Sequence, residues 1–108
     1  MIRVDIFRKK NNIVKLEMDG HAEYSEGDDI VCASASSVAF AVLNGIENVV
    51  GVNVGYETGD GYLFFVLPDD INEKEQDKVN VLTESFFLFM KELESQYPAH
   101  VKVTELEV

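Results

Sequence analysis

The sequence is poor in cysteine and in basic residues, and each shortage excludes a class of protein. Cys32 is the only cysteine among 108 residues, so no intramolecular disulfide can form and a reducing, cytoplasmic setting is expected. Lysine and arginine total 9 against 20 aspartates and glutamates, for a net charge of -11. Such a chain lacks the basic face that binds nucleic acid, and anionic membrane surfaces repel it. We expect neither as a partner.

Long apolar runs are also missing. The longest uncharged stretch, Ile30 to Ile46, has 17 residues and contains serines, an asparagine and a glycine, whereas a spanning helix needs about 20 apolar residues. Residues 1–5 alternate charged and apolar side chains, which does not suit the apolar region of a signal peptide. We therefore expect a water-soluble, cytoplasmic protein.

Metal and cofactor motifs are absent as well. One cysteine and two histidines cannot supply the paired ligands of a structural zinc site. A site formed by His21 with Glu23, Glu26 and Asp28 is conceivable, but acids clustered in a surface loop are usually solvated. No Walker loop or G-x-G-x-x-G motif occurs in the sequence. We expect no metal and no cofactor.

The hydrophobic period changes along the chain and divides it into seven elements. Apolar residues at every second position predict strands, and apolar residues three or four positions apart predict helices. The expected order is a hairpin within residues 1–20, a helix over 30–50, strands over 52–56 and 62–67, a helix from 72 to just before 98, and a strand over 101–106. We predict one α+β domain over residues 1–108 in ββαββαβ order. Its mixed or antiparallel sheet should carry both helices on one face.

Capping residues mark the ends of both expected helices. Either Asp28 or Asp29 is positioned to cap the first helix, and Gly51 can end it. Asn72 and Glu75 have the spacing of a capping box at the start of the second helix.

The strongest chemical signal is Gly20-His21 followed, after ten residues, by Cys32 in the first turn of the buried helix. The positive end of a helix favours the thiolate form of a cysteine. A histidine at the end of a strand could act first as base and then as acid for the leaving amine. Backbone N–H groups at the helix start could stabilise an oxyanion. The pattern therefore predicts thiol chemistry.

More ordinary roles exist for the same residues. A lone cysteine in a helix rich in alanine and serine is often a small core residue. Six nearby carboxylates would raise the pKa of a cysteine thiol, although they also favour an imidazolium that pairs with a thiolate. They are Glu17, Asp19, Glu23, Glu26, Asp28 and Asp29.

Residues Gly20 to Ala22 and Gly27 to Ser36, read as G-H-A and G-D-D-I-V-C-A-S-A-S, resemble the signature of the ribosomal-processing cysteine protease family, Prp. The similarity extends over the whole chain. It implies an endopeptidase that removes a short N-terminal extension from a basic protein of the large ribosomal subunit. It also implies cleavage after two phenylalanines and a homodimer.

The resemblance assigns a role to each matching residue. Cys32 is expected to be the nucleophile, His21 its base, and Gly20 a hinge that lets the following loop open. Asp29 either caps the helix or orients His21, and Ser36 lines the same face one turn after Cys32. The sequence does not distinguish a dyad from a triad.

Two further groups of residues are candidates for contact with a substrate. The loop after His21 could cover a bound peptide through Glu23, Tyr24, Gly27 and Asp28. The walls of an apolar slot for the two aromatic side chains could come from Tyr24, Tyr56 or Tyr62.

Other functions fit parts of the sequence. A non-catalytic adaptor could bind a basic ribosomal or nascent chain through its acidic face, with Cys32 buried and inert. A thiol redox sensor usually needs a second, resolving cysteine, which this chain lacks.

Overall fold

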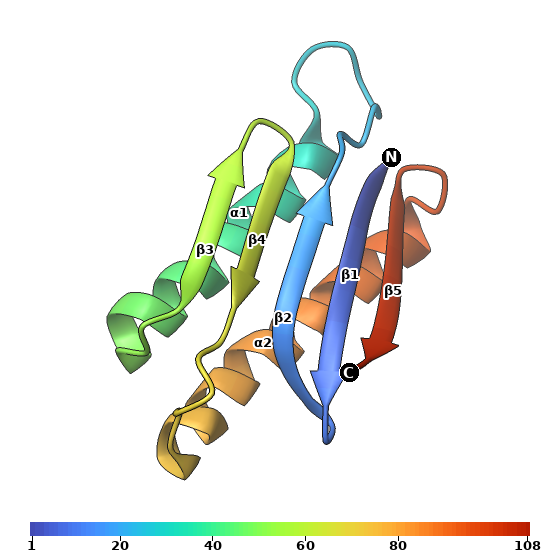
Figure 1. Cartoon of the computed structure of the whole chain (residues 1–108). Helices are drawn as coiled ribbons and strands as arrows, with labels where there is room; N and C mark the ends of the chain where they lie inside the picture. Colours follow the sequence, from blue (N-terminus) through green and yellow to red (C-terminus); the bar gives the residue numbers. More distant parts are fainter.

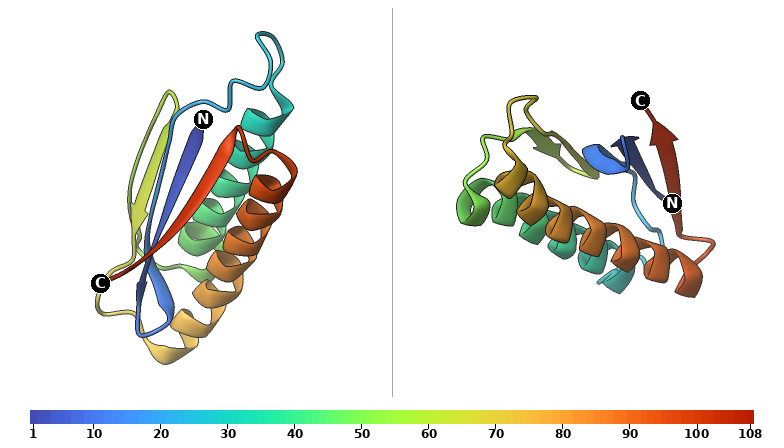
Figure 2. Two further views of the ribbon diagram at one scale, coloured as in Figure 1. Left: turned by 90° about the vertical axis from the view of Figure 1, so that its right-hand side faces the viewer. Right: turned by 90° about the horizontal axis from the view of Figure 1, so that it is seen from below.

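In the computed structural model of residues 1–108, five strands form one sheet and two helices pack against one of its faces (Figure 1, Figure 2). The elements are β1 (Ile2–Lys9), β2 (Asn12–Asp19), α1 (Ile30–Asn44), the π-helical turn η1 (Gly45–Val50), β3 (Gly55–Gly59), β4 (Tyr62–Val66), α2 (Glu73–Gln96) and β5 (Val101–Glu107). The predicted α+β class, element order and placement of both helices on one face are confirmed.

The strand order is β3-β4-β2-β1-β5. Neighbouring strands are antiparallel except β1 and β5, which are parallel because α2 carries the chain back across the sheet. The pairing of β2 with β4 continues past the strands, where the Gly20 N–H donates to the Gly61 carbonyl at 2.8 Å. The end of the first hairpin therefore lies beside the β3–β4 turn.

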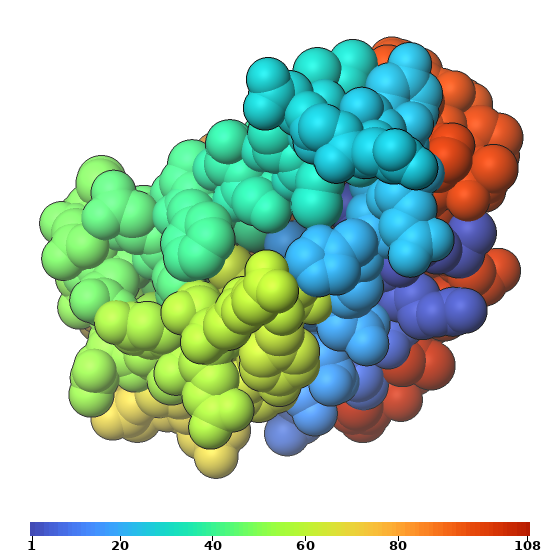
Figure 3. Space-filling view, turned by 90° about the horizontal axis from the view of Figure 1, so that it is seen from above, coloured from blue at the N-terminus to red at the C-terminus, as the bar shows by residue number.

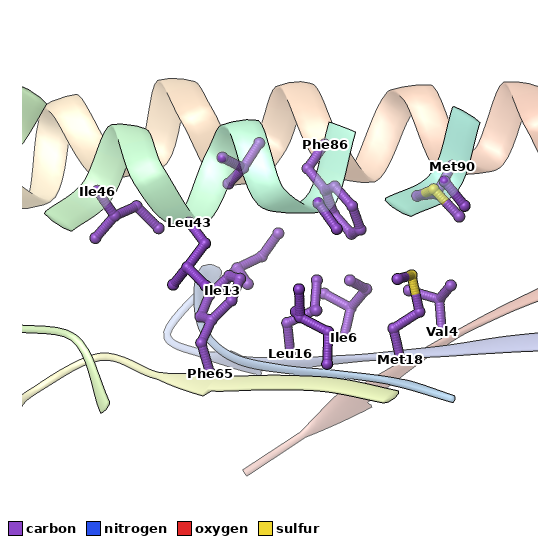
Figure 4. Packing of buried hydrophobic residues seen from close by; sticks show 14 of the residues in the cluster. Val4, Ile6, Ile13, Leu16, Met18, Leu43, Ile46, Phe65, Phe86 and Met90 are labelled. Carbon is purple, nitrogen blue, oxygen red and sulfur yellow. The ribbon is translucent and has the colours of Figure 1, made fainter. Parts of the chain in front are cut away.

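The core lies between the sheet and the two helices (Figure 4). The period of two in β1 buries Ile2, Val4 and Ile6 on the helix side. Phe86 and Met90, one helical turn apart on α2, point from the helix toward the sheet. Both helices are thus fixed to the sheet by apolar contact.

Segment Ile30–Val50 is long and apolar enough to cross a membrane by length and composition. In this fold its inner side chains belong to the protein core, which accounts for its apolar character. A Cβ at Gly45 would lie 3.0 Å from the Leu82 side chain, so a glycine lets α1 and α2 approach closely. Gly51 ends the segment with a left-handed φ of 87°, as predicted.

Two expectations about this region need correction. The first helix is not α-helical throughout, because its last residues, Gly45–Val50, form a π-helical turn. The strand expected from residue 52 begins only at Gly55. Val52 and Val54 are buried, but the Val54 N–H donates to the Val52 carbonyl. Their alternation reflects a turned connection with two side chains in the core.

The second helix begins as its sequence indicates. The Asn72 side chain accepts from the Glu75 N–H, and the Glu75 carboxylate accepts from the Asn72 N–H. This reciprocal pair is the predicted capping box. The helix ends at Gln96, just before Pro98.

Replacing Phe86 by alanine is expected to lower the free energy of unfolding by about 3–5 kcal/mol. The Phe86 side chain is buried between α2 and the sheet, so its removal leaves a cavity. Urea unfolding followed by circular dichroism measures the change. Leu88→Ala, at an exposed position on the same helix, is the control and should change stability by less than about 0.5 kcal/mol. Equal effects would contradict this account of the core.

Candidate active site

Residues from four parts of the chain line a pocket of about 220 Å³ at one end of the sheet. Viewed from that end, the surface is hollowed between the start of α1, the β3–β4 turn and the segment after β2 (Figure 3). The lining residues are Ile2, Met18, Gly20, His21, Cys32, Ser36, Phe40, Gly59, Asp60, Gly61, Tyr62 and Leu63. The structure thus brings Gly20, His21, Cys32 and Ser36 into one site.

Two glycines determine where His21 lies. Gly20 has a φ of 95°, and a Cβ there would lie 2.2 Å from the Met1 carbonyl oxygen, so only glycine fits. The chain turns at this point and places the imidazole against Gly61. A Cβ on Gly61 would lie 2.7 Å from His21 Nε2. The expected role of Gly20 as a hinge stays a prediction.

Cys32 is partly exposed in the first turn of α1, and Ser36 follows one turn later on the pocket side. Asp29 is the N-cap, and its Oδ1 accepts from the N–H groups of Val31 and Cys32, both at 3.0 Å. The Ala33 N–H donates to the Asp29 carbonyl. These three amides are occupied in this conformation, and the expected stabilisation of an oxyanion by the helix start stays a prediction.

The same carboxylate also holds the preceding loop. Asp29 Oδ2 accepts from the Tyr24 N–H at 2.9 Å and from the Ser25 N–H at 3.4 Å. Backbone hydrogen bonds, chiefly that from Cys32, lower the pKa of Asp29 below its usual value. In this structure Asp29 therefore caps the helix and also holds the loop to the helix start through hydrogen bonds.

The loop between His21 and Asp29 is held away from the pocket. The Tyr24 ring makes edge contacts with the rings of Tyr97 and His100, at centroid distances of 5.2 and 5.5 Å. His100 Nδ1 lies 2.8 Å from the Ala22 carbonyl oxygen. All of the proposed loop contacts with a substrate are exposed, and none of them lines the pocket: Glu23, Tyr24, Gly27 and Asp28. Their contact with a substrate stays a prediction.

No hydrogen bond joins His21 to Cys32, although both line the pocket. The nearest acid to the imidazole is Asp60, whose Oδ2 lies 3.9 Å from Nε2, and both side chains are exposed. Catalytic pairs often tighten only when substrate binds. The shared pocket therefore gives a thiol and an imidazole access to the same bound group.

Sequence reasoning missed the part of the site contributed by the β3–β4 turn and by Phe40. The glycines of the turn fit a hairpin, but no local pattern shows that β4 pairs with β2.

Tyr62, a predicted wall of an apolar slot, does line the pocket. Desolvation and nearby carboxylates, first Glu17, raise the pKa of its hydroxyl. Tyr62 therefore remains a protonated donor at neutral pH. No group of three histidine, cysteine or acidic side chains lies close enough to hold a metal ion.

Comparisons with known proteins match this site to a family. The sequence model of the family described as "Cysteine protease Prp" matches residues 1–102. The chain belongs to this family. It is 30% identical to the ribosomal processing cysteine protease Prp of Bacillus subtilis, over 96% of each chain. The family is one of cysteine proteases, and Cys32 is the only cysteine of this member.

Solved structures of the family share the fold. The essential ribosomal processing protease Prp from S. aureus, in complex with a covalently linked product peptide, is similar with a TM-score of 0.86 and 27% identity. The match covers 97% of this chain and 99% of that one. The complex of the same S. aureus protease with a substrate peptide matches over the same shares, with a TM-score of 0.82 and 26% identity.

Gly61→Ala should displace His21. With His21 as the expected base, peptide cleavage should fall by about 100-fold, because small misplacements of a reacting group cost this much. The added Cβ would lie 2.7 Å from Nε2, whereas a Cβ at Gly59 meets nothing within 4 Å. Gly59→Ala is therefore the matched control. Initial rates on one peptide, with melting temperatures of both variants, measure the effect. Equal rates for the two folded variants would show that the position of His21 does not depend on Gly61.

Asp29→Asn should destabilise the protein at neutral pH, and the difference from the natural protein should shrink below about pH 4. The folded state lowers the pKa of Asp29, so its stabilisation is present above the pKa of the unfolded chain and is lost as pH falls through the folded pKa. Urea unfolding from about pH 7 to 3 tests this, with Asp28→Asn as a control at an exposed carboxylate. A difference that does not change with pH would be inconsistent with a charged cap.

Proposed function

We propose that this protein is a cytoplasmic endopeptidase that removes a short N-terminal extension from a basic protein of the large ribosomal subunit, and that it works as a homodimer. The observation that carries the proposal is that His21 and Cys32 line one pocket in a chain of the Prp family. The names of the relatives, which are ribosomal processing proteases, support this substrate class.

In the proposed reaction, the Cys32 thiolate attacks the scissile carbonyl carbon and forms a tetrahedral intermediate. The C–N bond breaks as His21 donates a proton to the leaving amine. Water then attacks the thioester while His21 accepts its proton, and the Cys32 sulfur leaves. No metal or cofactor takes part.

The tetrahedral intermediate needs donors for its negative oxygen. The amides of Val31 and Cys32 are bound by Asp29, so their use would require the carboxylate to release them. Asp29 also holds the Tyr24 and Ser25 amides. Release of the loop and release of the helix amides are therefore linked through one side chain.

Charge favours the proposed substrate. A protein of net charge -11 attracts a basic chain, at a rate that falls as salt screens the field. An acidic adaptor without catalysis would show the same attraction, so only cleavage separates these two functions.

The test is the cleavage of a basic peptide with a Phe-Phe pair and a short N-terminal tail, read by mass spectrometry under reducing conditions. The natural protein should cut after the second phenylalanine. Cys32→Ala should keep the fold and lose at least about 1,000-fold in rate, because the nucleophile is gone.

Two outcomes would contradict the proposal. Cleavage by Cys32→Ala would remove Cys32 as the nucleophile. Binding without cleavage by the natural protein would favour the adaptor, and reversing the charges of Glu23, Glu26 and Asp28 should then abolish binding, whereas it should only slow a protease.

A further inference from the structure

A second hollow lies next to the pocket at Cys32, farther along α1. Phe40 lines both, and the second hollow, of about 210 Å³, lies between the end of α1, η1 and β3. Its lining residues are Phe40, Leu43, Asn44, Glu47, Asn48, Tyr56 and Thr58. We refer to the two hollows together as the α1–β3 groove. From Cys32 to Asn44 the helix rises roughly 18 Å, the length of about five residues of extended chain.

One wall of this groove is a strand with a free edge. β3 ends the sheet, with β4 on one side and no strand on the other (Figure 1). All of its residues are exposed. Proteins usually protect such edges with charged side chains, proline or a bulge. The sequence of β3, Gly-Tyr-Glu-Thr-Gly, has one charged residue, Glu57, and no lysine or proline, and its register with β4 is regular.

The hydrogen bonds of β4 show which groups of β3 are unpaired. Toward β2, the Gly61 carbonyl accepts from Gly20 and the Leu67 N–H donates to the Val14 carbonyl. Backbone groups alternate in direction along an antiparallel strand. The residues at positions 63 and 65 of β4 therefore bond to β2, and those at 62, 64 and 66 bond to β3.

The register then determines which way the backbone N–H and C=O groups of each β3 residue point. Positions 62, 64 and 66 are opposite Gly59, Glu57 and Gly55, which therefore bond to β4. The N–H and C=O groups of Tyr56 and Thr58 point away from the sheet, along the free edge. The side chains of the same two residues line the groove. The free edge thus offers two donors and two acceptors beside a groove that contains three hydrophobic side chains, Phe40, Leu43 and Tyr56.

We propose that the substrate chain binds in the α1–β3 groove as a sixth strand, paired through its backbone with Tyr56 and Thr58. An extended peptide presents donors and acceptors at the spacing that such an edge requires. Alternate side chains of the peptide would enter the groove between Phe40 and Tyr56, which are 49% and 50% exposed and can contact aromatic side chains. Because Phe40 lines both hollows, a chain bound in the groove would reach the Cys32 pocket, where its scissile bond would meet the thiol. The inference rests on the proposed function, and it adds the free edge of β3 to the binding site.

Amide hydrogen exchange, followed by NMR, tests the pairing directly. The protein is Cys32→Ala with the Phe-Phe peptide bound, and binding is measured separately by fluorescence anisotropy. The amides of Tyr56 and Thr58 should exchange at least about tenfold more slowly in the complex. Those of Glu57 and Gly59, already bonded to β4, are internal controls and should change little. A bound peptide that leaves Tyr56 and Thr58 unprotected would overturn the proposal.

A pair of variants tests the same contact during turnover. Thr58→Pro removes an outward N–H without removing a bond to β4, as is tolerated at an edge, and should raise KM. Thr58→Val makes a change of side chain at the same position but keeps the N–H, so the KM of Thr58→Pro should exceed that of Thr58→Val by about tenfold. Equal KM values for the two folded variants would count against the proposal.

Peptide variants require no change to the protein. N-methylation of single peptide residues should weaken binding at alternate positions on one side of the scissile bond, because only alternate N–H groups reach β3. Uniform sensitivity would contradict strand pairing. If the natural protein cleaves the peptide and these patterns are absent, only this inference fails. If it neither cleaves nor binds the peptide, the proposed function fails as well.

Discussion

The arrangement of the site depends on one close approach, between Gly20 and Gly61. Their hydrogen bond fixes the register of β2 with β4 at the end of the sheet. It also places His21 over a residue that has no side chain. A side chain at Gly20 would collide with the Met1 carbonyl, and one at Gly61 would collide with the imidazole. The position of His21 thus depends on close contacts among three parts of the chain: the N-terminus, the end of β2 and the β3–β4 turn.

A second constraint is the Asp29 carboxylate, which accepts from two amides of the helix start and two of the preceding loop. Its negative charge lies at the positive end of α1, where it stabilises the helix. The same charge occupies donors that the reaction could use. In the proposed reaction, the stability of the resting protein and the release of these amides therefore oppose each other at one residue.

The elements and their caps could be predicted from the sequence because they follow from local pattern. The alternation in β1, the Asn72–Glu75 pair and the acidic residue before α1 each report on neighbours a few residues away. The motif containing His21 and Cys32 also led to the family. Strand order is not local, so the entry of Asp60 and Gly61 into the site could not be predicted. Val52 and Val54 were predicted to belong to a strand because a turned connection that buries every second side chain gives the same alternation of residues in the sequence. That Asp29 would bind both loop and helix amides depends on loop geometry that no spacing encodes.

The free edge of β3 has a consequence for the behaviour of the protein in concentrated solution. A free strand edge is open to the same strand of another molecule, and edge-to-edge pairing is a common route to aggregation. The net charge of -11 opposes this route, because every copy repels every other at long range. Salt screens that repulsion but leaves the hydrogen-bonding edge intact. Colloidal stability is therefore maintained by the excess of acids, and it is weakest at high ionic strength or near the isoelectric point of about 4.4.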